Sequence, residues 1–234
     1  MLARVRPWLE KCGIALLSRP ALNRLDRKLA QLLPQRGGFF VEAGANDGFR
    51  QSNSYYLARF RGWRGILVEP MPHLAALCKQ ARPESTTVCC ALGAPEASGQ
   101  GVALRHAGLM SHVSGILSDE AGERQRAENG QRIQGMPAHD VMVKAQVRTL
   151  TEVLIQAGAP PQFDLLSLDV EGYEVEVLRG LDLSRFCPQG ICVEVRHGNK
   201  AAVEAILSPS HTLVEVLHHA KDHADYFWRA SGRV

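Results

Sequence analysis

The chain has 234 residues, a length that fits a single α/β domain with an extension. With 45% hydrophobic and 22% charged residues, its composition is ordinary for a globular protein and argues against extensive disorder. Its formal charge of +3 falls well short of the concentrated Lys/Arg face that marks nucleic-acid binding. The apolar run GIALL is too short for a signal peptide or a membrane span, and the six cysteines include no CxxC pair. We therefore expect a cytoplasmic protein with reduced thiols and neither a nucleic-acid nor a membrane partner.

The N-terminal part of the chain carries one clear helical pattern. Leucines recur at helical spacing through residues 21–33, with Arg, Lys and Asp between them, and Pro34 follows. This pattern predicts an amphipathic helix that packs on the body of the protein. We accordingly assign residues 1–36 to a helical extension and residues 37–234 to a single domain.

Strand-like and helix-like stretches alternate after the extension. GFFVEAG, RGILVEP and TTVCCALG read as strands, whereas SNSYYLARFRG and PHLAALCKQAR read as helices. Such alternation is typical of βαβ units, in which helices cover both faces of a mostly parallel sheet. The sequence therefore predicts an α/β, Rossmann-like fold.

The middle of the chain loses this pattern before order returns. Residues 96–146 are rich in Gly, Ser, His and charge and show no apolar face, which predicts a lid or insertion loop. Thr149 and Glu152 then form a capping box that starts a helix. The strand FDLLSLDV, the helix EGYEVEVLRGL, the strand GICVEVR and the helix NKAAVEAIL follow. The tail, HTLVEVLHHAKDHADYFWRA, predicts an antiparallel hairpin at the edge of the sheet.

The first strand ends in an unusual run, VEAGANDG at residues 41–48. A glycine turn at the carboxyl end of a parallel strand lets a ligand approach the backbone closely. The dinucleotide pattern GxGxxG fails here, because Asn46 occupies the place of the second glycine. The carboxylates of Glu42 and Asp47 would repel a phosphate but suit an ammonium or a sulfonium. Glu69, at the end of the next strand, is placed to accept the two hydroxyls of a ribose.

Three motifs, FVEAGANDG, GILVEP and above all FDLLSLDVEGYEVEVLRGL, make the chain resemble the FkbM family of S-adenosylmethionine-dependent methyltransferases. The resemblance runs from about residue 39 to residue 192 and implies a class I methyltransferase domain over residues 37–234. It implies that the turn, with Glu42, Gly44, Ala45, Asn46 and Gly48, binds the methionine part of the cofactor, with Glu42 near the amino group. By the same resemblance Glu69 holds the ribose, and Ala91 and Leu92 flank the adenine.

Candidate catalytic groups gather in SLDVEGYE and in the next strand end. Asp169 is expected to face the methyl group and is also a candidate cofactor-binding residue, and either Asp169 or Glu171 could act as general base. The alternative is that Asp169 only orders the loop or the cofactor and that Glu171 caps the next helix. Glu194 and His197, on the neighbouring strand end, suggest a proton acceptor or substrate contact at His197. An Asp and a Glu together could also bind Mg²⁺, so metal dependence is left open.

These residues lead to one functional hypothesis and two alternatives. The hypothesis is methyl transfer to a hydroxyl of a sugar or another small hydroxylated metabolite, an acceptor class that comes from the family resemblance alone. A nicotinamide-dependent oxidoreductase is weaker, because the second glycine and a Tyr-x-x-x-Lys pair are missing. A scaffold protein that keeps the fold without chemistry is the other alternative. The oligomeric state is undetermined, and a homodimer is compatible with the sequence.

Overall fold

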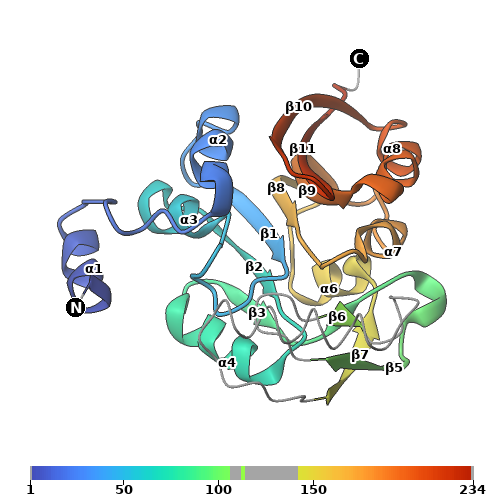
Figure 1. The fold of residues 1–234 in the computed structure, drawn as a ribbon, viewed down its shortest axis with the longest axis horizontal. Coiled ribbons are helices and arrows are strands. Elements are labelled where there is room, and N and C mark those ends of the chain that lie inside the picture. The colour runs from blue at the N-terminus through green and yellow to red at the C-terminus, as the bar shows by residue number, and fades with distance from the viewer. Residues whose placement is uncertain (1, 106–111, 114–141, 233–234) are drawn as a thin grey trace.

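A computed structural model describes residues 2–105, 112–113 and 142–232 of the chain. Its main feature is a seven-stranded sheet in the order β10-β11-β9-β8-β1-β2-β3 (Figure 1). The strands of this sheet are β1 (Phe39–Ala43), β2 (Arg64–Val68), β3 (Thr86–Val88), β8 (Gln162–Leu168), β9 (Cys187–Arg196), β10 (His211–His219) and β11 (His223–Ala230). The first five pair in parallel, whereas β11 runs antiparallel to both β9 and β10.

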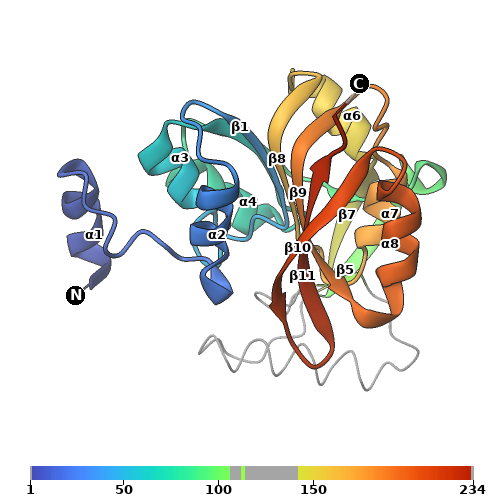
Figure 2. The same cartoon turned by 90° about the horizontal axis from the view of Figure 1, so that it is seen from above.

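Helices cover both faces of this sheet. They are α2 (Leu25–Leu32), α3 (Tyr55–Arg61), α4 (Pro72–Ala81), α6 (Leu150–Gln156), α7 (Glu174–Arg179) and α8 (Lys200–Leu207). The chain also forms α1 (Leu2–Lys11), which stands apart from the sheet, and the 3-10 turns η1 (Leu22–Arg24), η2 (Pro95–Ala97) and η4 (His197–Asn199). Figure 2 shows α2, α3 and α4 on one side of the sheet and α6, α7 and α8 on the other. The predicted Rossmann-like fold, with a mostly parallel sheet and an antiparallel edge hairpin, is confirmed.

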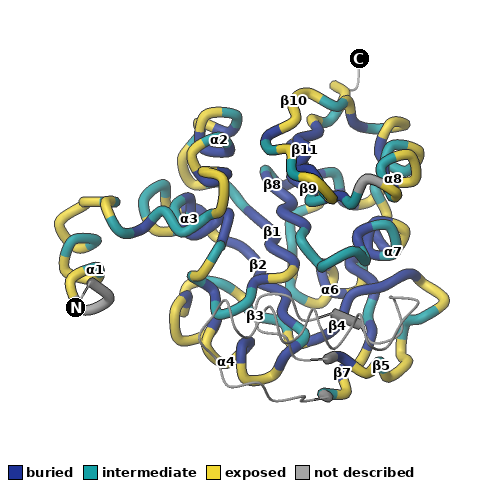
Figure 3. Tube along the Cα trace, viewed as in Figure 1, coloured by how far each residue is buried: buried dark blue, intermediate teal, exposed yellow. Residues whose placement is uncertain are grey.

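The two faces are built by side chains that alternate along each strand. Phe40 and Leu165 point into the cluster beneath α2 and α3, whereas Val41 and Leu166 point into the cluster beneath α6, α7 and α8. This alternation follows from the period of two in a β-strand. Both clusters are fully buried, as the dark central strands in Figure 3 illustrate. The central strands are mostly apolar because both of their faces are covered, and Glu42 and Ser167 are buried polar exceptions near their carboxyl ends.

A second, four-stranded sheet lies beside the main one, in the order β4-β7-β5-β6. Its strands are β4 (Ala91–Leu92), β5 (Gly101–Arg105), β6 (His112–Val113) and β7 (Met142–Arg148). The sequence predicts one strand over TTVCCALG, but the structure divides it into β3 and β4, which belong to different sheets. It also predicts a loop over residues 96–146, whose two ends are instead the paired strands β5 and β7. The middle of that segment, residues 106–111 and 114–141, lies outside the described residues.

The helix predicted over residues 21–33 is shorter than the leucine spacing suggests. Asn23 and Arg24 have positive φ angles of 52° and 59°, so the chain bends and α2 begins only at Leu25. Leu25, Leu29 and Leu33 are buried against the sheet, whereas Leu22 is exposed. None of the described helices is long and apolar enough to cross a membrane.

Candidate active site

The turn after β1 is held against the loop after β8 by a close backbone contact at Gly44. Gly44 has a φ of +86°, and a Cβ atom at this position would lie 1.8 Å from the carbonyl oxygen of Asp169. The backbone N–H of Asp169 donates to the carbonyl of Ala43 (3.1 Å), which ties the same two segments together. Only glycine fits here, because both the left-handed backbone and the missing side chain are needed.

Glu42, at the end of β1, is a buried carboxylate surrounded by donors from its own protein. The hydroxyls of Ser52 and Ser54 donate to its Oε2 at 2.8 and 2.5 Å, and the N–H of Asn53 donates to Oε1 at 2.7 Å. The Arg82 guanidinium lies 3.4 Å away in an equally buried ion pair. Glu42 therefore organises the segment that follows the turn, and its predicted contact with the cofactor amino group stays a prediction.

Glu69 terminates β2 as a second buried carboxylate, but with fewer partners. The N–H groups of Asn46 and Met71 each donate to one of its oxygens, at 2.9 and 3.0 Å. Burial raises the pKa of Glu69 to about 7. A carboxylate oxygen can accept more than one hydrogen bond, so each oxygen retains capacity for a ligand hydroxyl.

The loop after β8 carries the predicted catalytic carboxyls. Burial raises the pKa of Asp169, whose Oδ1 is buried and has no hydrogen-bond partner among the described residues. Glu171 adopts a φ of +58° and forms an ion pair with Arg196 (Oε2–Nη2, 3.5 Å). Glu174 holds the backbone of this loop in place, because its Oε1 accepts hydrogen bonds from the N–H groups of Val170 and Gly172 at 3.2 and 2.9 Å.

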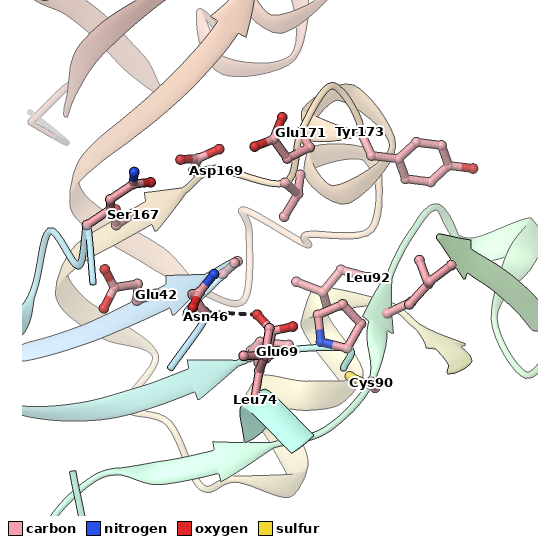
Figure 4. Close-up of a pocket in the computed structure, with 18 of the residues that line it drawn as sticks. Glu42, Asn46, Glu69, Leu74, Cys90, Leu92, Ser167, Asp169, Glu171 and Tyr173 are labelled. Carbon is pink, nitrogen blue, oxygen red and sulfur yellow. Dashed lines mark hydrogen bonds between the residues drawn. The ribbon is translucent and has the colours of Figure 1, made fainter. Parts of the chain in front are cut away.

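These segments enclose one pocket at the carboxyl ends of the parallel strands (Figure 4). Asp169 and Glu171 extend from the loop after β8, across the pocket from Glu69 and Leu74. The predicted site residues that line it are Glu42, Gly44, Asn46, Glu69, Ala91, Leu92, Asp169 and Glu171. Ala45 and Gly48 lie outside the lining: Ala45 is buried in the core, and a Cβ on Gly48 would meet the backbone of α4.

Sequence reasoning missed several residues of the pocket. Asn53 lies among them, and its Oδ1 is buried without a hydrogen-bond partner among the described residues, while its Nδ2 donates to Ser167 Oγ (3.1 Å). Leu74 and Leu104 extend the apolar wall that Ala91 and Leu92 form. Leu74 comes from α4, and Leu104 comes from β5, a segment that the sequence predicts to be loop. No local pattern in the sequence indicates that these two residues lie in the same pocket.

A row of ionisable residues continues from the pocket across the next strands. Glu194 on β9 pairs in register with Asp225 on β11, which pairs in turn with His218 on β10. Burial and then the carboxyl of Asp169 raise the pKa of Glu194 to about 9. His223 contacts Glu194 (Nε2–Oε2, 3.7 Å). Glu194 and Asp169 are thus brought to one edge, as predicted from the strand order.

The metal hypothesis gains no support from this row. Among the described residues, no group of three or more His, Cys, Asp or Glu side chains is arranged to hold a metal ion. The backbone of His197 begins η4, but its side chain lies outside the described residues. The predicted roles of His197 as proton acceptor or substrate contact stay predictions.

We compared the chain with known sequences, structures and families. No curated protein sequence matches the chain. Similar solved structures include a TehB-like SAM-dependent methyltransferase from Corynebacterium glutamicum (12% identity, TM-score 0.46, covering 98% of this chain and 96% of that one). They also include a SAM-dependent methyltransferase from Aquifex aeolicus (7%, 0.47, 96% and 98%) and a precorrin-6y C5,15-methyltransferase from Geobacter metallireducens (10%, 0.47, 89% and 88%). Likeness this weak carries no argument about activity.

A family model matches most of the chain. The model of the methyltransferase FkbM domain matches residues 42–226, which include the turn after β1, Glu69, the loop after β8 and most of the edge hairpin. That span covers well over half of the chain and every candidate site residue named above. The protein therefore belongs to the FkbM methyltransferase family.

Proposed function

We propose that the protein uses S-adenosylmethionine to methylate a hydroxyl oxygen of a sugar or another small hydroxylated metabolite. The observation that carries the cofactor assignment is the order of polarity along the pocket. Glu69 offers acceptors for hydroxyls, Ala91 and Leu92 with Leu74 and Leu104 form an apolar wall, and two unpaired buried oxygens lie on Asn53 and Asp169. Adenosylmethionine presents the matching groups, namely ribose hydroxyls, a flat base and an ammonium.

The two unpaired oxygens, on Asn53 and Asp169, give the strongest support for this ligand. A buried acceptor without a donor costs about 1–3 kcal/mol, so two in one pocket favour a ligand that donates several hydrogen bonds. An ammonium has that property and also carries the charge that Asp169 favours. We assign the binding of the ammonium to Asn53 and Asp169. Glu42 is a weaker candidate, because Ser52, Ser54 and Arg82 already bind its carboxylate.

The chain's own residues also suggest how the reaction proceeds. The bound cofactor would supply an activated methyl group on a positively charged sulfur. The protein must align the acceptor oxygen with that group and remove its proton. Asp169 and Glu171 both line the pocket, and because Asp169 is assigned to the ammonium, Glu171 is the candidate general base. Its ion pair with Arg196 orients it.

A nicotinamide cofactor fits the same turn poorly. The N–H groups of Phe49 and Arg50 both donate to Asp47 Oδ1, at 2.9 and 2.7 Å. In a dinucleotide site, N–H groups at this position face a pyrophosphate. Here they are occupied by a carboxylate, which would also repel the phosphates.

Calorimetric titration tests the cofactor assignment. The purified protein would be titrated with S-adenosylmethionine, S-adenosylhomocysteine and NAD, beside Glu69→Ala and the matched control Glu84→Ala, which removes an exposed acid. We expect both adenosyl ligands to bind, with affinity reduced about tenfold to hundredfold in Glu69→Ala and unchanged in Glu84→Ala. Binding of NAD alone would overturn the proposal, and absence of all binding would favour the scaffold alternative.

Transfer of a radiolabelled methyl group tests the acceptor. The protein would be incubated with labelled S-adenosylmethionine and a set of sugars and polyols, each paired with its deoxy analogue. We expect alkali-stable label in hydroxylated acceptors only, and its loss in Glu171→Gln with cofactor binding retained. Label in amines or carboxylates, but not in hydroxyls, would contradict O-methylation.

A further inference from the structure

The N-terminal segment, residues 2–20, exposes large apolar side chains. Leu16 is 78% exposed and Trp8 63% exposed, with Ile14 at 44% and Val5 at 39%. These four account for much of the exposed large apolar surface among the described residues, although the segment is a small part of the chain. Figures 1 and 3 show α1 standing away from the sheet, with little of it buried. Exposed apolar groups gathered in one place mark an interaction site.

The same segment carries the net charge of the protein. It contains Arg4, Arg6, Lys11 and Arg19 against the single acid Glu10, a formal charge of +3. The whole chain also has a formal charge of +3, so the remaining residues are neutral in sum. A partner of this segment should therefore be both apolar and anionic.

The segment is attached to the body by its polar side chains. Glu10 accepts from Ser18 Oγ, Tyr55 Oη and Arg59 Nε at 2.6, 2.9 and 3.0 Å. The Arg6 guanidinium lies 3.6 Å from the centre of the Phe49 ring. A helix that packs on its own domain usually turns its apolar face inward. This one turns its acid inward and leaves Trp8 outside.

We propose that residues 2–20 dock the protein on the surface of an anionic lipid bilayer. In this arrangement α1 lies in the plane of the interface, and Trp8 and Leu16 enter the boundary between headgroups and acyl chains. The exposed Lys11 faces the phosphates, while Arg6 and Arg19 stay stacked on Phe49 and Tyr56 of the body. Tryptophan favours this boundary, and basic side chains add attraction to anionic lipids. With ten residues, α1 is too short to span the bilayer, so it would lie on it.

Charge argues against the simplest competing occupant. A second copy of the chain would bring one segment of charge +3 against another in a symmetric contact. Like charges oppose that arrangement, whereas an anionic surface is attracted. The proposal departs from the expectation of no membrane partner, which was based only on the absence of a long apolar run. It does not rest on the proposed methyltransferase reaction.

Vesicle co-sedimentation of the full chain tests the proposal. Vesicles of phosphatidylcholine alone would be compared with vesicles that also contain phosphatidylglycerol, at low and high salt. We expect binding to the anionic vesicles only, weakened by salt and reduced about tenfold or more in Trp8→Ser/Leu16→Ser. The control is Leu77→Ser/Ile155→Ser, which removes two exposed apolar residues (42% and 46%) from α4 and α6 and should bind as the wild type does.

Any one of the following results would overturn this inference. The first is no binding of the wild-type chain to anionic vesicles. The second is an equal loss in the control variant, which would make the effect non-specific. The third is a dimer in solution that Trp8→Ser/Leu16→Ser converts to a monomer, which would assign the segment to a second copy of the chain. The fourth is binding to polyglutamate without binding to vesicles, which would assign the segment to an acidic protein. Circular dichroism of each variant verifies that it is folded.

Discussion

Gly44 is the residue at which the two halves of the pocket touch. We predict that Gly44→Ala destabilises the protein by at least about 2 kcal/mol, because the new Cβ would collide with the Asp169 carbonyl as well as strain the backbone. Gly62→Ala is the matched control, since Gly62 has a similar φ of +71° and a Cβ added there would meet nothing within 4 Å. Urea unfolding measures both. An equal loss at the two positions would mean that backbone strain alone is responsible.

Glu69 gives the ligand-free protein a predictable pH dependence. Its pKa is about 7 in the folded state against an ordinary value of 4.5, so between these values the folded state holds a proton that the unfolded state has released. Its contribution to stability is therefore fully present below pH 4.5 and is lost as the pH rises to 7, by about 3 kcal/mol. We predict that Glu69→Gln loses less stability than the wild type over this range.

Urea unfolding at several pH values measures this difference. Glu84→Gln, a change at an exposed acid, is the control and should follow the wild type. Other buried acids, such as Glu174 with a pKa of about 7, remain in every variant, so the difference isolates Glu69. Parallel curves for Glu69→Gln and the wild type would mean that the carboxyl is already ionised when folded.

The sequence indicates the acidic and glycine residues of the pocket but not its complete lining. Glu42, Glu69 and Asp169 end strands, and parallel strands bring their carboxyl ends to one edge, so their proximity follows from the strand pattern alone. Asn53 lies in an irregular segment whose path is set by Glu42 and Arg82. No periodic pattern encodes that path, which is why Asn53 was missed.

At the scale of elements, the buried pair of Glu42 and Arg82 links the end of β1 to the end of α4. We predict that Arg82→Met destabilises the protein by about 3–5 kcal/mol, because it leaves a buried carboxylate without its cation. The double change Glu42→Gln/Arg82→Met should recover part of this loss. Chemical denaturation of the four proteins in the cycle measures the interaction, and additive effects would contradict it.

The start of α6 is the element boundary that the sequence predicts best. The N–H of Glu152 donates to Thr149 Oγ1 (3.1 Å) and the N–H of Thr149 donates to Glu152 Oε2 (2.7 Å), which confirms the capping box. We predict that Thr149→Ala lowers the free energy of unfolding by about 1 kcal/mol, whereas Thr149→Ser retains most of it. A lower midpoint in urea at unchanged slope is the expected measurement. An equal loss in Thr149→Ser would point to the methyl group instead of the cap.

Elements whose identity depends on distant partners were predicted less well. Residues 142–148 alternate between apolar and polar side chains, but this strand pattern is short and its partners β5 and β4 lie far away in the sequence, so the segment is read as part of the loop. The break at Cys89 separates two strands that belong to different sheets, which no local signal marks. The capping box, by contrast, is complete within four residues and is therefore visible in the sequence.

At the scale of the whole molecule, the central sheet joins two apolar clusters into one folding unit. Trp63 belongs to the cluster beneath α2 and α3, whereas Trp228 belongs to the cluster beneath α6, α7 and α8. Because β1, β2, β8 and β9 contribute to both, we predict that Trp63 and Trp228 report the same unfolding transition. Fluorescence of single-tryptophan variants, with Trp8 replaced by Phe in each, should coincide with circular dichroism. Separate midpoints would mean that the two faces unfold independently.

The contact of Arg6 with Phe49 has a thermodynamic consequence. Phe49 adjoins Arg50, which lines the pocket, so the N-terminal segment and the cofactor turn share one loop. Any partner that shifts Arg6 when it binds must change the free energy of that loop, and hence the affinity of the pocket. Reciprocity then requires that a ligand in the pocket change the affinity of the segment by the same factor. A bilayer and a cofactor would thus each regulate the other's occupancy through a single arginine stacked on a single ring.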